Sequence, residues 1–426
     1  MRITCAVALA AACSSSSGTP DGAGGGDAGS PAGPTAVRVT LANVPPDPAA
    51  SQFIVAYQDG DGPWQLAPAP TGSAYALTIA SASYRFAYLC NANHEPTVAL
   101  AQFTAAEKPD LTMVVDSACT PAVTQAMVQV TGTITETAAT QSGEFTIQLG
   151  LQDGAAEAIA GSSVPYTAMV QPGTYDVIAT FQAQVLGDVD LALTRRSVTI
   201  AADTTLDFDF TNAEPTRMVA ADSLAATGSG ATNTGESLLL TANGTTALLG
   251  YDKAAPFHFD ALPADQAVAS DLYEQDFRAG DGSASGETFI FAHTPAAVTG
   301  ASPLPFAAVA SVATTTPYPE LAFAFDAYPD AIGYQLSAGQ SQQPNVVEWH
   351  VYTGPEFAGA SPQIRVPDLT SIPGWTAALQ LGSGDIGGTI FAVTSSRGAA
   401  DFPLAFQPAP DGTVQAVSYA SFDVMP

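Results

Sequence analysis

The chain has 426 residues, of which 46% are hydrophobic and only 12% are charged, and its 40 acidic and 11 basic residues give a formal net charge of −29. This apolar content excludes a wholly disordered chain, and the length allows about two to four domains. The negative field repels phosphate groups, so we expect no binding to nucleic acid. Such acidity either keeps a protein with few charges soluble or suits a saline medium, and composition leaves both interpretations open.

The first residues have the features of an export signal. Arg2 precedes a short apolar run, residues 3–12, which is too short to span a bilayer as a helix. Cys13 follows small residues and resembles the cysteine of a bacterial lipobox, although Ala10 stands where that family usually has leucine. The resemblance implies that residues 1–12 are cleaved and that the thiol of Cys13 is acylated, and Ser14 favours the outer membrane. The alternative is an ordinary signal peptide in which Cys13 has no role.

Residues 14–34 are rich in Ser, Gly, Ala and Pro and have no apolar periodicity. Such a composition is typical of a flexible linker. We therefore expect residues 13–34 to be a lipidated cysteine followed by a disordered tether that holds the folded part away from a membrane.

The remaining cysteines support export. Cys5 lies in the segment expected to be cleaved, which leaves Cys90 and Cys119 as an even pair. In an oxidising compartment this pair predicts a disulfide, which stabilises a fold by roughly 3–4 kcal/mol in the chain-entropy model. No C-x-x-C motif occurs, which excludes a thioredoxin-like redox role and a cysteine-rich zinc site.

From residue 35 onward apolar and polar residues alternate with period two, most clearly at residues 37–41 and 206–210. Alternation predicts half-buried strands, and turn signals recur about every ten residues. No amphipathic helical stretch exceeds about three turns. We therefore predict an all-β fold of tandem Ig-like or transthyretin-like β-sandwiches, followed by a larger β-sandwich region.

Two adjacent segments match as diverged copies of one unit. Residues 37–40 match residues 128–131, Gln58-Asp59-Gly60 matches Gln152-Asp153-Gly154, and Tyr84 aligns with Tyr175, all in the same order. The match predicts one sandwich at 35–122, which carries the disulfide, and its diverged repeat at 123–213.

In the second copy, Pro172-Gly173 forms a turn signal directly before Tyr175. This pattern resembles the strand entry of carboxypeptidase regulatory-like, transthyretin-like sandwiches, which implies a non-catalytic accessory module. The first copy has Ala82-Ser83 in place of the Pro-Gly pair.

Residues 214–426 form the larger region, with an alternative division into two near residue 314. Its segment 321–352, with an aromatic strand, Gly333-Tyr334 and Trp349, resembles the middle of a fibronectin type III-like sandwich. The whole layout is similar to multi-sandwich lipoproteins of myxobacteria and their relatives. The strands expected in this region are residues 237–241, 288–292, 321–325, 333–337, 346–352, 375–380 and 389–393.

Motifs for catalysis are absent from the sequence. Gly282-Ser283-Ala284-Ser285-Gly286 has Ala284 where a nucleophile elbow needs serine, and neither a P-loop nor an H-E-x-x-H motif occurs. The histidines are His94, His258, His293 and His350, and the last three make a metal trio only if the fold gathers them. We interpret them as ordinary strand or loop residues, and expect no enzyme and no cofactor.

Two kinds of ligand site remain open. Asp59 and Asp61 lie in an Asp-Gly-Asp-Gly turn and are calcium candidates, although Asp-Gly pairs are also common in hairpins. Trp64 and Trp375 are candidates for a sugar-binding platform, although tryptophans more often fill cores.

The sequence thus predicts a non-enzymatic, lipid-anchored protein of a bacterial cell envelope, at the outer membrane, with a structural, adhesive or ligand-binding role. The alternatives are a carbohydrate-binding lipoprotein that uses exposed tryptophans, and a divergent hydrolase within 214–426. Its expected partners are the membrane, through the lipid, and a glycan or protein ligand.

Overall fold

The fold is nearly all β, as the alternation predicts, and the all-β expectation is confirmed. The computed structural model describes residues 34–92, 95–120, 126–135, 143–150, 152–158, 163–183, 189–210, 216–217, 219–220, 234–252, 260–280, 285–294, 306–342, 345–403 and 408–426. Within these ranges α1 (Pro355–Ala358) is the one α-helix, and no helix has the length and apolar character needed to cross a bilayer.

The first unit is a two-sheet sandwich. Its outer sheet has the order β4-β1-β7, with β1 (Thr35–Ala42), β4 (Ala74–Ile79) and β7 (Asp110–Val114). Its second layer is β2 (Ile54–Asp59), β3 (Gln65–Leu66), β5 (Ser83–Ala92) and β6 (Glu95–Thr104). The layers bury Val37, Val39 and Leu41, while Arg38 faces outward. The alternation of apolar and polar residues in β1 thus follows from the alternation of side chains along a strand.

The second unit has the same strand order. Its central strand β8 pairs antiparallel with β11 and parallel with β14, as β1 pairs with β4 and β7. Its strands are β8 (Val128–Thr135), β9 (Gly143–Leu149), β10 (Gln152–Ala158), β11 (Ser163–Val170), β12 (Gly173–Gln182), β13 (Leu191–Ile200), β14 (Thr204–Thr205), β15 (Phe208–Asp209) and β16 (Thr216–Arg217).

Two details of the repeat differ from the sequence alignment. Gln58 and Asp59 end β2, before the turn of their hairpin, whereas residues 152–154 begin β10, after the turn of theirs. The two matched segments therefore occupy different positions in the two copies. The equivalent turn positions are Gly60 (φ 54°) and Gly150 (φ 65°), both in the left-handed region that glycine tolerates. The strand expected at 206–210 is interrupted, because within it β15 covers Phe208–Asp209 alone, although the amides of Leu206 and Phe210 also donate to carbonyls of β8.

The C-terminal region contributes eight strands to a twelve-stranded sheet of order β19-β18-β21-β22-β29-β28-β25-β26-β6-β5-β2-β3. The eight are β18 (Thr234–Leu240), β19 (Thr246–Asp252), β21 (Leu272–Gly280), β22 (Ser285–Ala292), β25 (Gly333–Gln342), β26 (Asn345–Thr353), β28 (Ile386–Ser395) and β29 (Thr413–Val424). The remaining strands are β17 (Val219–Ala220), β20 (Asp260–Ala261), β23 (Ala308–Thr314), β24 (Glu320–Phe325) and β27 (Gln363–Arg365).

One expected strand is wrong. Residues 375–380 form a series of turns with a short 3₁₀-helix, η2 (Ala377–Leu379). The amide of Trp375 donates to the carbonyl of Ile372, and that of Leu379 donates to Thr376. Apolar residues here reach the core from successive turns, so their spacing in the sequence is similar to the spacing expected of a strand.

The first unit and the C-terminal region meet along a parallel pair of strands, β6 and β26, which we call the seam. Its register runs from Thr97 opposite Glu348 to Gln102 opposite Thr353. The neighbouring β5 and β6 are buried on both faces, because one face packs in the first sandwich and the other against the C-terminal region. Strands covered on both sides read as continuous apolar runs rather than alternating ones.

Side chains reinforce the seam. The Glu107 carboxylate accepts hydrogen bonds from the amides of Glu356 and Phe357 at the start of α1, at 2.9 and 3.2 Å. Lys108 is buried, and its ammonium group donates to the carbonyl of Ala399 at 2.5 Å. Both residues belong to the first unit and both partners to the C-terminal region, so the two parts form one body.

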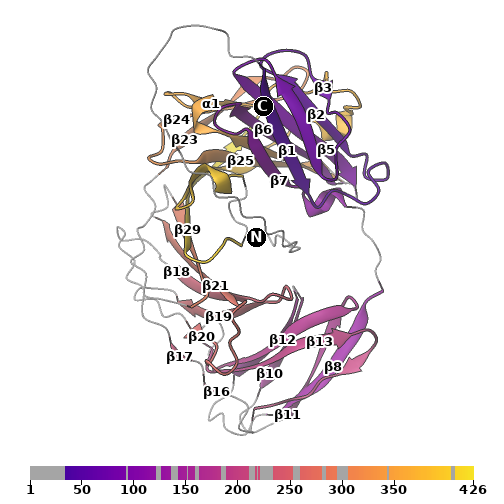
Figure 1. Ribbon diagram of the computed structural model, residues 1–426, viewed down its shortest axis with the longest axis vertical. Coiled ribbons are helices and arrows are strands. Elements are labelled where there is room, and N and C mark those ends of the chain that lie inside the picture. Colours follow the sequence, from indigo (N-terminus) through magenta and orange to yellow (C-terminus); the bar gives the residue numbers. More distant parts are fainter. Residues whose placement is uncertain are drawn as a thin grey trace.

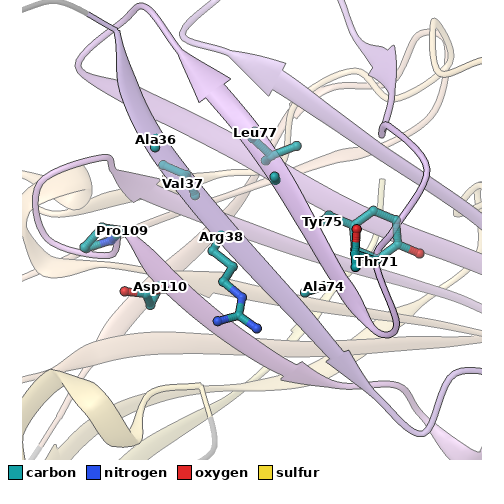
Figure 2. Close-up of a pocket in the computed structure, with 10 residues that line it drawn as sticks. Ala36, Val37, Arg38, Thr71, Ala74, Tyr75, Leu77, Pro109 and Asp110 are labelled. Atoms are coloured by element: carbon teal, nitrogen blue, oxygen red, sulfur yellow. The ribbon is translucent and has the colours of Figure 1, made fainter. Parts of the chain in front are cut away.

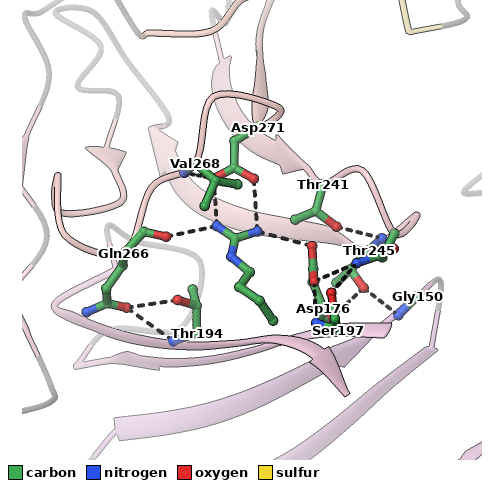
Figure 3. Close-up of polar contacts among 11 residues, drawn as sticks. Gly150, Asp176, Thr194, Ser197, Thr241, Thr245, Gln266, Val268 and Asp271 are labelled. Carbon is green, nitrogen blue, oxygen red and sulfur yellow. Dashed lines mark hydrogen bonds and ion pairs between the residues drawn. The ribbon is translucent and has the colours of Figure 1, made fainter. Parts of the chain in front are cut away.

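The second unit (magenta in Figure 1) lies at the opposite end of the long axis from the first unit (indigo). It contacts β18, β19 and β21 through a small apolar cluster that includes Ile178, Leu249 and Tyr273. Beside this cluster Arg196 of β13 reaches Asp271, at the start of β21, and Asp176 of β12 (Figure 3). The second unit is therefore held by both apolar and ionic contacts.

Candidate functional site

The two calcium candidates lie at the turn after β2, and of the two Asp59 has a structural role there. The Asp59 carboxylate accepts hydrogen bonds from the amides of Ala80 and Ser81, both at 2.9 Å. Asp61 is exposed, and one of its oxygens lies 3.3 Å from Arg85 Nη1. Asp59 thus holds the neighbouring turn, and its oxygens are already engaged.

Of the two tryptophan candidates, Trp64 belongs to the core and Trp375 packs against it. Trp64 is only 6% exposed and packs in the cluster between the first unit and the C-terminal region. Trp375 is half-buried and stacks on Tyr318, with ring centroids 5.7 Å apart. Trp349 is fully buried, and its indole N–H donates to the Leu379 carbonyl at 2.9 Å. The structure therefore places Trp64 and Trp349 as core residues, and Trp375 packs against that core while part of it stays exposed.

A shallow pocket of about 400 Å³ lies on the outer face of the β4-β1-β7 sheet. Figure 2 shows Arg38 at its centre, with Asp110 on one side and Ala74 on the other. Small side chains make up much of the remaining lining, and Arg38 is exposed. The pocket is open to solvent, and its two charged residues, Arg38 and Asp110, are both exposed. The pocket therefore gives little support for a catalytic or binding site.

A more concentrated set of polar groups lies at the seam. Asp116, Glu348 and His350 each offer one ligand atom, and these atoms all lie within 4.8 Å of one another. His350 Nε2 is 3.8 Å from Asp116 Oδ2 and 3.8 Å from Glu348 Oε2. Among the described residues this is the one group of three or more His, Cys, Asp or Glu side chains with such a geometry. We call these three residues the seam triad.

Strand geometry brings two members of the seam triad together. Glu348 and His350 are two residues apart in β26, so their side chains leave the same face of the sheet. The residues between and beside them, Val347, Trp349 and Val351, point to the opposite face and fill the core. The imidazole of His350 lowers the pKa of the Glu348 carboxyl, although partial burial opposes this shift.

Asp116 is positioned by its own short segment. It caps the 3₁₀-helix η1 (Ser117–Cys119), where its Oδ1 accepts from the amide of Ala118 at 2.8 Å. Its amide donates to the hydroxyl of Tyr88 at 3.1 Å, and Cys119 is bonded to Cys90 in β5. These contacts leave Oδ2 directed at His350.

A fourth residue contacts the histidine from the other side. Ser337 of β25 lies opposite His350, and its Oγ is 3.3 Å from His350 Nδ1. The Nε2 atom of the same ring is buried and has no hydrogen-bond partner within the described part of the chain. A buried polar nitrogen beside two carboxylates is suited to bind a metal ion.

The same four residues do not make a hydrolytic triad. Such a triad needs an acid hydrogen-bonded to the histidine, and 3.8 Å is longer than a hydrogen bond. Ser337 also lies in the middle of β25, between β26 and β28, whereas a nucleophilic serine usually stands on an exposed turn. The geometry therefore favours ligation over nucleophilic attack.

Another set of perturbed carboxyl groups lies on β21 and β22. Burial, with Glu287 and Glu236 nearby, raises the pKa of Glu274 to about 7. Burial also raises the pKa of Asp276, whose Oδ2 is 3.1 Å from Arg278 Nη2. Both groups lie on β21, which pairs with β18 and β22 inside the large sheet, so we interpret them as a pH-sensitive part of the sheet.

Sequence reasoning found only part of the seam triad. The sequence predicts a metal trio of His258, His293 and His350 only if the fold gathers them. His293 instead contacts the Asp271 carbonyl, and His94 and His258 lie outside the described residues. The Glu-x-His spacing of β26 was the available signal. No spacing could have indicated Asp116, which comes from another sheet layer.

Cys13, the candidate lipidation site, also lies outside the described residues.

No protein-family model matches this chain, and no curated protein sequence is significantly similar to it.

Proposed function

We propose that this protein is a non-enzymatic lipoprotein of a bacterial cell envelope, anchored at the outer membrane through Cys13, which presents a rigid β-sandwich body as a structural, adhesive or ligand-binding surface. The observation that carries the proposal is the disulfide between Cys90 and Cys119, whose Cα atoms are 5.4 Å apart. Both cysteines are fully buried. Because disulfides persist in oxidising compartments, this bond supports export.

The rigidity of the body supports a display role. The twelve-stranded sheet runs without a break from β19 to β3 and joins the first unit to the C-terminal region. Residues 14–34 have the composition of a flexible tether. A flexible tether followed by a rigid body is suited to presenting surfaces at a distance from a membrane.

The absence of a catalytic motif from the sequence supports a non-enzymatic role, as does the position of Ser337 inside a sheet. The burial of Trp64 favours a protein ligand over a glycan stacked on tryptophan.

Anchoring is tested by replacing Cys13 with Ser in the full chain expressed in a bacterial host, with Cys5→Ser as the matched control. The proposal predicts that the wild type and Cys5→Ser enter the detergent phase of a membrane extract, while Cys13→Ser stays in the aqueous phase. If Cys13→Ser partitions like the control, the anchoring proposal is wrong.

A further inference from the structure

The seam triad joins two parts of the chain that are distant in sequence. Asp116 follows β7 in the first unit, whereas Glu348 and His350 belong to β26 in the C-terminal region. Their ligand atoms meet beside the seam, where Glu348 lies opposite Thr97 and His350 opposite Ala99 of β6. Any ion held by all three residues would bridge the two parts.

We propose that Asp116, Glu348 and His350 bind a divalent transition-metal ion, Zn²⁺ by ligand chemistry, and that this ion links the first unit to the C-terminal region across the seam.

The separations of the ligand atoms fit an ion of this size. Zn²⁺ binds imidazole nitrogen and carboxylate oxygen at about 2.0–2.2 Å, so tetrahedral ligands lie roughly 3.4 Å apart. His350 Nε2 is 3.8 Å from each carboxylate oxygen, so these two separations need to shorten by only a few tenths of an ångström, and all three ligand atoms lie within 4.8 Å of one another. Zn²⁺ also satisfies the buried Nε2, which has no other partner within the described ranges.

Two of the three ligands, Asp116 and His350, are held in place before any ion binds. Asp116 is fixed by its cap to Ala118 and by the Tyr88 hydroxyl, and the adjacent disulfide restrains its backbone. The contact from Ser337 to Nδ1 orients the imidazole so that Nε2 faces the carboxylates. Contacts of this kind orient metal ligands and raise affinity.

The donor set selects the class of metal. One imidazole nitrogen with two carboxylates suits Zn²⁺ and its first-row neighbours, whereas Ca²⁺ and Mg²⁺ prefer oxygen ligands alone. The side chains of Asp116 and Glu348 are 31% and 47% exposed, so an ion can enter from solvent. The strong negative charge of the chain raises the local concentration of cations.

The test uses the full chain without a histidine tag, titrated with Zn²⁺ alone in equilibrium dialysis. The site variants are Asp116→Asn, which keeps the capping oxygen, Glu348→Gln, and His350→Ala. The matched controls are His293→Ala and Glu356→Gln, and circular dichroism confirms that every variant is folded. We expect the wild type and both controls to bind one Zn²⁺ at this site, and each site variant to bind it at least about tenfold more weakly.

The linking role has its own readout. With Zn²⁺ at 100 times the dissociation constant of the wild type, we expect the melting temperature of the wild type to rise by about 3 °C and that of the site variants to rise by at most about half as much. Zn²⁺ should also slow amide hydrogen exchange in residues 97–102 and 348–353. Equal Zn²⁺ affinity in wild type and all three site variants would overturn the site. Binding without slower exchange at these residues would overturn the link, and displacement of Zn²⁺ by equimolar Ca²⁺ would overturn the metal class.

Discussion

Arg196 and Asp271, 75 residues apart in the chain, form a two-point ion pair in which Nη1 is 2.9 Å from Oδ1 and Nη2 is 2.6 Å from Oδ2 (Figure 3). The Asp271 side chain is only 1% exposed, and Arg196 also contacts Asp176, which is 4% exposed. Because Arg196 belongs to the second unit and Asp271 directly precedes β21 of the large sheet, the pair ties these two bodies together.

Replacing Arg196 with Met should therefore leave two buried carboxylates without their cation. Removing one partner of a buried ion pair costs about 3–5 kcal/mol, and urea unfolding measures the loss. Asp61→Asn is the control, since it removes an exposed ion pair worth at most about 1 kcal/mol. Equal losses in the two variants would show that the Arg196 contacts do not hold the units together.

The disulfide should be a major source of stability. It closes a loop with a sequence separation of 29, for which the chain-entropy model gives about 3–4 kcal/mol. We expect dithiothreitol to lower the melting temperature of the wild type, and to have no effect on a Cys90→Ala, Cys119→Ala double variant that already melts lower. An equal response of both proteins to the reductant would contradict this.

Stability should fall as pH rises from about 4.5 to about 7, because of Glu274. Its pKa is raised to about 7 in the folded protein, against an ordinary value of 4.5. Within that window the folded state keeps a proton that the unfolded state releases, so deprotonation costs roughly 2–3 kcal/mol by pH 8. Urea unfolding at pH 5 and pH 8 measures the difference. Glu274→Gln should reduce the difference in unfolding free energy between pH 5 and pH 8 by the roughly 2–3 kcal/mol that the Glu274 proton contributes. An unchanged pH dependence in that variant would contradict the assignment.

Trp64 should act through packing. Trp64→Ala opens a cavity in the cluster between the first unit and the C-terminal region, which costs about 3–5 kcal/mol. Leu66→Ala, two residues away in β3, is the control because Leu66 is 55% exposed. Thermal unfolding compares the two, and a Trp64→Ala variant as stable as Leu66→Ala would mean that the ring is not a core residue.

Much of the fold follows from local patterns in the sequence. Period two predicts β1, and most expected strands of the C-terminal region coincide with observed ones, such as β24 and β28. Cysteine counting predicts the Cys90–Cys119 bond. These features depend on side chains near in sequence, or on the small number of cysteines, so one chain is enough to find them.

The seam could not be predicted in this way. The pairing of β6 with β26 joins residues about 250 positions apart, and the local sign of it in the sequence is the apolar run at residues 98–101 of β6. Such a run indicates burial on both faces but does not name the neighbouring strand. The seam triad depends on that pairing, so Asp116 could not be assigned to His350 before the fold was known.

The most direct test of the proposed function is mass spectrometry of the mature N-terminus, on protein isolated from the membranes of a bacterial host. The proposal predicts that the chain begins at Cys13 and that this residue carries acyl groups. A mature chain that retains residues 1–12, with an unmodified thiol at Cys13, would contradict it.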